Sequence, residues 1–171
     1  WVSGRPGLAS LGLAQLQGRI DLPEPWNRLC VTALEKPQPR VTLGRALVGF
    51  ASAAIDVSDG LLADLGHIGE RSGLASAVHL VQLPHLPRGE TCDAGLRRLA
   101  LECQLAGGDD YEICFTTPAG QANAVGAIAA RLELPLWCIG SMVAGRAGEV
   151  TVLDPDDNPI EFPRRGYDHF A

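Results

Sequence analysis

The chain has 171 residues, of which 46% are hydrophobic and 20% are charged, and its formal net charge is −6. This composition is typical of a globular domain that is large enough to bury a core. An acidic chain without a Lys/Arg cluster is not expected to bind nucleic acid, and no apolar stretch approaches the roughly 20 residues that span a bilayer.

Helical and strand-like segments intermix along the chain. Apolar spacing, prolines and glycines predict helices within 8–20, 21–36, 37–50, 60–73, 91–106 and 119–134. Alternating or continuous apolar runs predict strands within 1–4, 52–57, 75–83, 111–118, 136–143 and 149–162, with a hairpin turn at "DPDDNP". The order follows no strict βαβ repeat. It favours the α+β class, as a layered α/β sandwich with a mixed sheet, over a doubly wound parallel fold.

The cysteines and histidines show no metal-ligand spacing. No CxxC pair is present, and no cysteine has a histidine at the sequence spacing that is typical of metal ligands. We therefore expect buried, reduced thiols in a cytoplasmic protein at Cys30, Cys92, Cys103, Cys114 and Cys138. Structural rather than catalytic roles are expected for His67, His79 and His85.

The stretch "IDVSDG" places two carboxylates where a predicted strand meets a predicted helix. Asp56 and Asp59 could hold a hard cation such as Mg²⁺, while the helix N-terminus faces a phosphate. The alternative is helix capping, in which Ser58 or Asp59 bonds to exposed N–H groups and Asp56 is incidental. The pattern alone favours capping, because caps are so frequent.

Two further stretches could carry chemistry. In "AGGDDYE", two glycines allow a tight turn before Asp109 and Asp110, although a hairpin or loop turn has the same composition. In the tail "RRGYDHFA", Tyr167 follows a glycine and could stack on a flat heterocycle. The alternative for the tail is an aromatic-anchored terminus that packs on the body of the domain.

Taken together, these stretches resemble a known family. "AIDVSDGLLADLGHI", "LAGGDDYEICFT" and "GYDHF", with "PQPRVTLGRAL" upstream, resemble in order and spacing the C-terminal half of the thiamine-monophosphate kinase family. The resemblance implies the C-terminal domain fold of the aminoimidazole ribonucleotide synthase superfamily. It also implies that 1–171 form a single substrate- and nucleotide-binding domain. The family's N-terminal metal- and ATP-binding domain, and much of its dimer interface, would then lie outside this chain, and the full-length protein would be a homodimer.

The resemblance implies transfer of the ATP γ-phosphoryl group to thiamine phosphate, assisted by Mg²⁺. Carried over by position, Asp56 and Asp59 match magnesium ligands and Ser58 matches a nucleotide contact. Asp109, where the family usually has glutamate, and Tyr167 match substrate-binding positions. No catalytic base is assigned, because a phosphate oxygen is already ionised at neutral pH.

The same motifs leave two alternatives. One is another ATP-dependent member of the superfamily, such as a selenophosphate synthetase-like enzyme, and the other is a ligand-binding module without catalysis. One departure concerns the first loop, where Leu8 stands at the position of a family aspartate. The chain alone is expected to be inactive, because it offers only one acidic turn and one acidic loop to neutralise two phosphate-bearing substrates.

Overall fold

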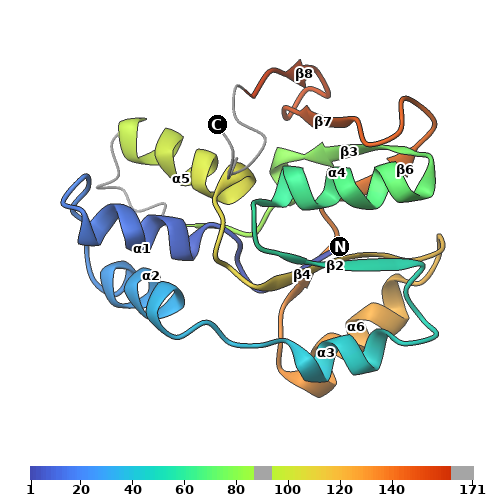
Figure 1. Cartoon of the computed structure of the whole chain (residues 1–171), viewed down its shortest axis with the longest axis horizontal. Coiled ribbons are helices and arrows are strands. Elements are labelled where there is room, and N and C mark those ends of the chain that lie inside the picture. Colours follow the sequence, from blue (N-terminus) through green and yellow to red (C-terminus); the bar gives the residue numbers. More distant parts are fainter. Residues whose placement is uncertain (87–93, 163–171) are drawn as a thin grey trace.

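The computed structural model describes residues 1–86 and 94–162 (Figure 1). Its helices are α1 (Leu8–Leu16), α2 (Trp26–Glu35), α3 (Val41–Leu47), α4 (Leu61–Ser72), the short 3₁₀ helix η1 (Leu80–Gln82), α5 (Ala94–Ala106) and α6 (Ala122–Leu132). Its strands are β1 (Val2–Ser3), β2 (Ala53–Val57), β3 (Ala75–His79), β4 (Glu112–Thr116), β5 (Leu136–Trp137), β6 (Gly140–Val143), β7 (Val150–Leu153) and β8 (Pro159–Ile160).

The strands form two separate four-stranded sheets. The first has the order β2-β4-β1-β5, and all of its neighbours are antiparallel. The second has the order β6-β3-β7-β8, in which β3 and β7 are parallel and the other pairs are antiparallel. The α+β class and the mixed sheet are therefore confirmed, but the chain builds two sheets around its core.

Helix α4 lies between the two sheets, and α3 and α6 cover the far face of the first sheet (Figure 1). Leu61 and Leu65 of α4 share one buried cluster with Val57 of the first sheet and Val78 of the second. Phe115 points the other way from β4, into a cluster with α3 and α6. The alternation of side chains along β4 thus supplies both cores of the layered structure.

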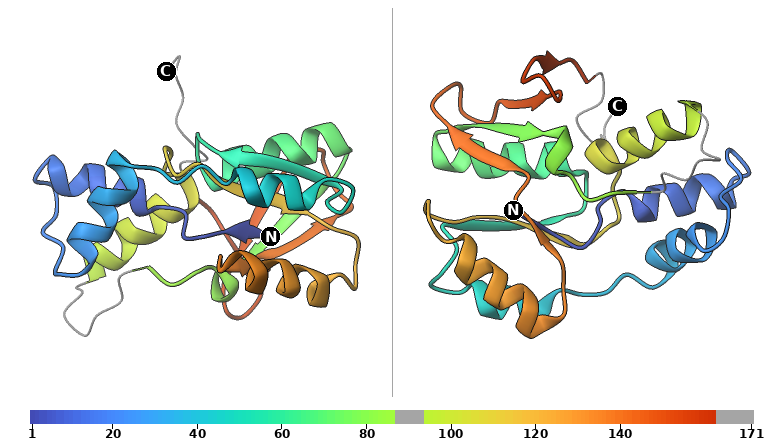
Figure 2. Two further views of the ribbon diagram at one scale, coloured as in Figure 1. Left: turned by 90° about the horizontal axis from the view of Figure 1, so that it is seen from below. Right: turned by 180° about the vertical axis from the view of Figure 1, so that it is seen from behind.

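A third cluster joins α1, α2 and α5, which lie together to one side of the sheets (Figure 2). Leu11, Cys30 and Ala100 are among its buried residues. Gly12 lets α1 and α2 approach closely, because a Cβ there would lie 2.2 Å from the carbonyl oxygen of Cys30. In this group of three helices, the N-terminus of α1 and the C-terminus of α5 both point toward one edge of the first sheet (Figure 1). The motifs "IDVSDG" and "GGDDYE" lie at the same edge.

The segment 136–143, expected as one strand, divides between the two sheets. Trp137 Nε1 donates a hydrogen bond of 2.8 Å to the carbonyl oxygen of Gly4, which fixes β5 beside β1. Ile139 is buried in the cluster between the sheets, and Gly140 then begins β6. The strand therefore breaks at the point where the chain crosses the core.

The strand expected over 75–83 is shorter than predicted, because β3 ends at His79 and the 3₁₀ helix η1 follows it. One expectation among the thiols is also corrected. Gly73, at φ 68°, ends α4 in the left-handed conformation that favours glycine. Cys30, Cys103 and Cys114 are buried free thiols, but Cys138 is exposed, so its burial was wrongly predicted. Cys92 lies outside the described residues. No helix within the described ranges is long and apolar enough to cross a membrane.

Two glycines offer a matched test of this packing. A Cβ at Gly140 would lie 1.9 Å from the Ala77 carbonyl oxygen, whereas a Cβ at Gly126 in α6 would meet nothing within 4 Å. We expect Gly140→Ala to lower the free energy of unfolding by about 1–3 kcal/mol, through overpacking against backbone. Gly126→Ala should raise it by about 0.5–1 kcal/mol, because alanine is the better helix former. Urea denaturation of both variants measures this, and a shift of the same sign in both would contradict it.

Candidate functional site

The two acidic motifs are joined by backbone hydrogen bonds. The strands β2 and β4 pair from Ala53 with Thr116 to Val57 with Glu112. Beyond their ends the pairing continues, because Tyr111 N donates to Val57 O and Asp109 N donates to Ser58 O, both at 2.9 Å. The predicted site residues of "IDVSDG" and "GGDDYE" therefore lie side by side at one edge of the first sheet.

The turn between β2 and α4 is held by a carboxylate that follows it. Asp56 is exposed, and Ser58 and Asp59 are half-buried. Asp64 is only 3% exposed, and its Oδ2 accepts hydrogen bonds from Ser58 N at 2.9 Å and Asp59 N at 3.1 Å. Burial raises the pKa of Asp64 above its usual value, and these N–H bonds oppose that rise.

The prediction that Ser58 or Asp59 caps helix α4 is wrong. The N-cap residue of α4 is Gly60, at φ 123°, and it makes no side-chain capping bond. Ser58 and Asp59 stand before the cap, and Asp64 in the first helical turn supplies the carboxylate for their N–H groups. Sequence reasoning missed this role of Asp64, although its position four residues after Gly60 places it over the turn.

The loop 107–111 joins α5 to β4, so it is not a hairpin. Gly108 permits its approach to the turn, because a Cβ there would lie 2.4 Å from Ser58 O. Asp109 and Tyr111 have φ values of 67° and 51° and are both exposed. Left-handed conformations are uncommon for such residues, and they tend to occur at functional sites.

Asp110, between these two outward residues, instead caps α1. Its Oδ2 accepts a bond of 2.6 Å from Gly7 N, and its Oδ1 accepts one of 3.1 Å from Ala9 N. Gly7, the N-cap residue of α1, has no side-chain capping bond of its own. Loss of hydration raises the pKa of Asp110 to about 7, and the bonds from Gly7 and Ala9 oppose the rise. The start of α1 is thus anchored by a carboxylate from the second motif.

Glu112, the last acid of this motif, is a structural ion-pair partner. Arg40 of "PQPR" binds it through two nitrogens, with Nη2–Oε1 at 2.6 Å and Nε–Oε2 at 2.7 Å. Ser3 Oγ donates to Glu112 Oε2 and accepts from Ile113 N. Gly4 leaves the space for this carboxylate, because a Cβ there would overlap Glu112 Oε1. The pair therefore links the segment before α3 to β4 and β1.

Asp56 and Asp59 are the acids of the turn that could bind a hard cation. Their carboxylate oxygens are suitable ligands, but two carboxylates do not complete the coordination of such an ion. Among the residues that the structure describes, no three His, Cys, Asp or Glu side chains lie close enough to hold a metal ion. Asp56 and Asp59 offer carboxylate oxygens, and Mg²⁺ commonly uses one or two carboxylates with waters and substrate phosphates. Two histidines are engaged elsewhere, with Nδ1 at 3.3 Å from Glu70 for His67 and at 3.3 Å from Asp157 for His79. The aromatic candidate Tyr167 lies outside the described residues.

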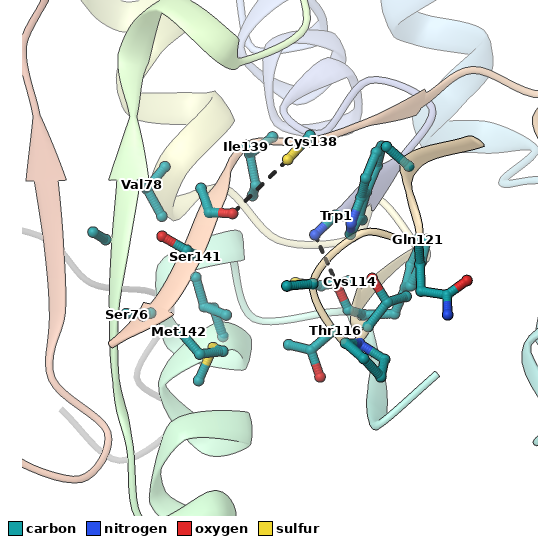
Figure 3. Close-up of a pocket in the computed structure, with 18 of the residues that line it drawn as sticks. Trp1, Ser76, Val78, Cys114, Thr116, Gln121, Cys138, Ile139, Ser141 and Met142 are labelled. Atoms are coloured by element: carbon teal, nitrogen blue, oxygen red, sulfur yellow. Dashed lines mark hydrogen bonds between the residues drawn. The ribbon is translucent and has the colours of Figure 1, made fainter. Parts of the chain in front are cut away.

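A pocket of about 380 Å³ opens between the sheets, at the other end of β4 (Figure 3). Trp1, Thr116 and Gln121 line one side, and Ser141 and Met142 of β6 line another. Among the described residues that line it there is no Asp, Glu, Lys, Arg or His. Because these residues offer no charged side chain that could meet a metal or a phosphate, the acidic turn and loop remain the candidate site.

The ionisation of Asp110 gives a pH prediction. Its raised pKa means that the folded chain binds this proton more readily than the unfolded chain. The free energy of unfolding should therefore fall as pH rises from about 5 to about 7, by at most about 1.4 kcal/mol per unit from this group. Asp110→Asn should remove that component, whereas Asp109→Asn, the same charge change next to it, should keep it. Denaturation at several pH values tests this, and equal slopes in the two variants would contradict it.

The Arg40–Glu112 pair gives a third stability prediction. Glu112 is 7% exposed, so Arg40→Met would leave a buried carboxylate without its cation. We expect a loss of about 3–5 kcal/mol in unfolding free energy, and Glu112→Gln added to Arg40→Met should recover part of it. Arg98→Met, which breaks the exposed pair with Glu102, should cost no more than about 1 kcal/mol. A loss from Arg40→Met as small as that of the Arg98 variant would contradict the assignment.

Comparisons with known proteins agree with these motifs. No protein-family model matches the sequence. Thiamine-monophosphate kinase of Salmonella typhimurium is 40% identical over 176 aligned positions, which cover 100% of this chain and 52% of the relative. The enzyme of the same name from Escherichia coli K12 is 37% identical with the same coverage. The chain thus spans about half the length of the curated relatives it matches.

Solved structures show the same relationship. The crystal structure of thiamine-monophosphate kinase from Stenotrophomonas maltophilia K279a is 44% identical, with a TM-score of 0.77 over 89% of this chain and 48% of that one. AaThiL complexed with AMPPCP and TMP is 28% identical, with a TM-score of 0.72 over 99% of this chain and 50% of that one. A hydrogenase maturation protein, HypE, shares the fold at 18% identity and a TM-score of 0.60. This chain is therefore related, over its whole length, to the thiamine-monophosphate kinases, and it corresponds to about half of one.

Proposed function

We propose that the complete protein transfers the γ-phosphoryl group of ATP to thiamine phosphate and releases thiamine diphosphate and ADP. The observation that carries this proposal is the backbone pairing of the acidic turn with the acidic loop, through Asp109 N to Ser58 O and Tyr111 N to Val57 O. This pairing brings the turn that carries the proposed metal ligands and the loop that carries the proposed substrate contact to the same edge of the first sheet. The relatives' name, and the AMPPCP and TMP in one related structure, support the same reaction.

In this proposal the acidic turn serves the nucleotide. Asp56 and Asp59 would hold Mg²⁺, and Ser58 would contact the nucleotide. The N-terminus of α4, a helix of 12 residues, begins directly after the turn and carries a partial positive charge that favours phosphate. Bound Mg²⁺ would neutralise charge on the phosphates as they approach. Because the described residues supply two such carboxylates at the turn, further ligands are assigned to an N-terminal domain, of which this chain would be the C-terminal partner.

The acidic loop would serve the acceptor. Asp109 is exposed and is held beside the turn by its own N–H, so its carboxylate can meet the substrate. Tyr167 would pack its ring against the thiamine part, for which a flat cationic ring is a suitable partner. A homodimer in the cytoplasm completes this proposal for the full-length protein.

The chemistry asks for alignment and charge neutralisation more than for proton transfer. The acceptor is a phosphate oxygen that is ionised at neutral pH, so no side chain has to remove a proton from it. What the chain's own residues must do is fix the turn, orient the acceptor and exclude other nucleophiles. The glycines at 60 and 108, which allow close backbone approach, and the carboxylate of Asp64 serve the first of these tasks.

The test is a steady-state assay of the complete protein with Mg²⁺, ATP and thiamine phosphate. Asp56→Asn and Asp59→Asn should each lower kcat/KM by roughly 10²–10³, because each removes charge that stabilises the transferring group. Asp156→Asn, an equal charge change in the exposed turn between β7 and β8, should leave it within about twofold. Absence of thiamine phosphate turnover in the unmodified protein, or near-normal turnover in both site variants at saturating Mg²⁺, would contradict the proposal. ADP release with a different acceptor would instead favour another superfamily activity.

A further inference from the structure

Asp64 is set apart from the other two acids of the turn, Asp56 and Asp59, by where its carboxylate lies. It is in the first turn of α4 and is 3% exposed, whereas Asp56 is exposed and Asp59 is half-buried. A single oxygen, Oδ2, accepts from both Ser58 N and Asp59 N, at 2.9 and 3.1 Å. These two N–H groups belong to the residues that the proposed function assigns to nucleotide and metal. Asp64 thus binds the main chain that carries them and faces away from solvent.

Contacts on several sides restrict the conformation of the turn. On one side a Cβ at Gly60 would lie 2.9 Å from the carbonyl carbon of Ala106, so the turn rests directly on the end of α5. On another side Ser58 O accepts the bond from Asp109 N. Asp64 supplies the remaining restraint, from within α4. Hydrogen bonds to a charged acceptor are roughly twice as strong as neutral ones. Because these bonds end on a side chain, a single substitution at Asp64 removes both of them.

From this geometry we propose that Asp64 is a positioning residue, which holds the Ser58–Asp59 peptide so that the side chains of Asp56 and Asp59 are preset to receive a divalent cation with its nucleotide. The inference rests on the proposed function for the identity of the ligand. It extends that function, because Asp64 would touch neither metal nor substrate and would act through the two N–H groups. Partners of this kind behind metal ligands typically change metal affinity or activity by about 10- to 100-fold when removed.

The first readout is amide hydrogen exchange at Ser58 and Asp59 in the complete protein. Asp64→Ala removes the acceptor, and exchange at both amides should become about 10- to 100-fold faster. Asp64→Asn keeps an acceptor oxygen but loses the charge, so its effect should be intermediate. Glu70→Gln removes one carboxylate from an exposed position of the same helix, and exchange at the two amides should stay within about twofold of the unmodified protein. Unchanged exchange in Asp64→Ala would overturn the proposal.

The second readout is binding of Mn²⁺ in the presence of AMPPCP, measured by electron paramagnetic resonance. Its Kd should rise about 10- to 100-fold in Asp64→Ala and by a smaller factor in Asp64→Asn. In turnover, KM for thiamine phosphate should rise by a smaller factor than this Kd, since Asp64 bonds the turn and the acceptor loop follows only through the turn. If Asp64→Ala does not fold, Asp64→Asn decides, and Mn²⁺ binding equal to that of the unmodified protein in this variant would overturn the proposal. Faster exchange with unchanged Mn²⁺ binding would also overturn it.

These readouts separate the two proposals. Exchange and Mn²⁺ binding need no transfer to thiamine phosphate. If the unmodified protein turns over another acceptor while Asp64→Ala still weakens Mn²⁺ binding, the proposed function fails and the role of Asp64 stands. If the unmodified protein binds no Mn²⁺ with AMPPCP, the role of Asp64 is overturned as well.

Discussion

The structure of the candidate site depends on the continuation of the β2–β4 pairing past the ends of both strands. Two N–H groups of the loop 107–111 donate to the carbonyl oxygens of Val57 and Ser58, and this fixes the loop against the turn. Such close backbone contact needs Gly108, where any Cβ would meet Ser58 O. The two segments therefore take their places from main-chain geometry, and the exposed side chains of Asp56 and Asp109 face solvent.

Burial divides the acids of these motifs into two kinds. Asp64, Asp110 and Glu112 turn inward, and each holds main-chain N–H groups or an arginine. Asp56 and Asp109 turn outward into solvent. An inward carboxylate must be paired to offset its lost hydration, and here each one ties together segments that are distant in sequence or adjacent across a turn. The inward acids thus stabilise the backbone of the segments from which the outward acids project into solvent.

The sequence allowed the local part of this structure to be predicted, together with the family. The end of α4 at Gly73 and the hairpin between β7 and β8 follow from residues within a few positions, and the four motifs in order indicated the kinase relationship. What could not be predicted depends on distant partners. Asp110 caps a helix that begins about a hundred residues earlier, and no local pattern reveals this. The division of 136–143 between two sheets likewise depends on β1 and β3, which its own alternation does not encode.

The place of β1 inside the first sheet has a consequence for how the chain acquires its structure. Val2, at the start of the chain, pairs with Cys114 on one side and with Trp137 on the other. Val2 precedes both partners by more than a hundred residues, so in synthesis β1 is made well before the strands that it pairs with, while the helices α1 to α4 can already form. Sheets closed by such long-range contacts fold slowly, because loop entropy is lost before the contacts compensate for it. The step that completes this sheet is therefore the late and aggregation-sensitive one, and it also brings Asp110 to the start of α1.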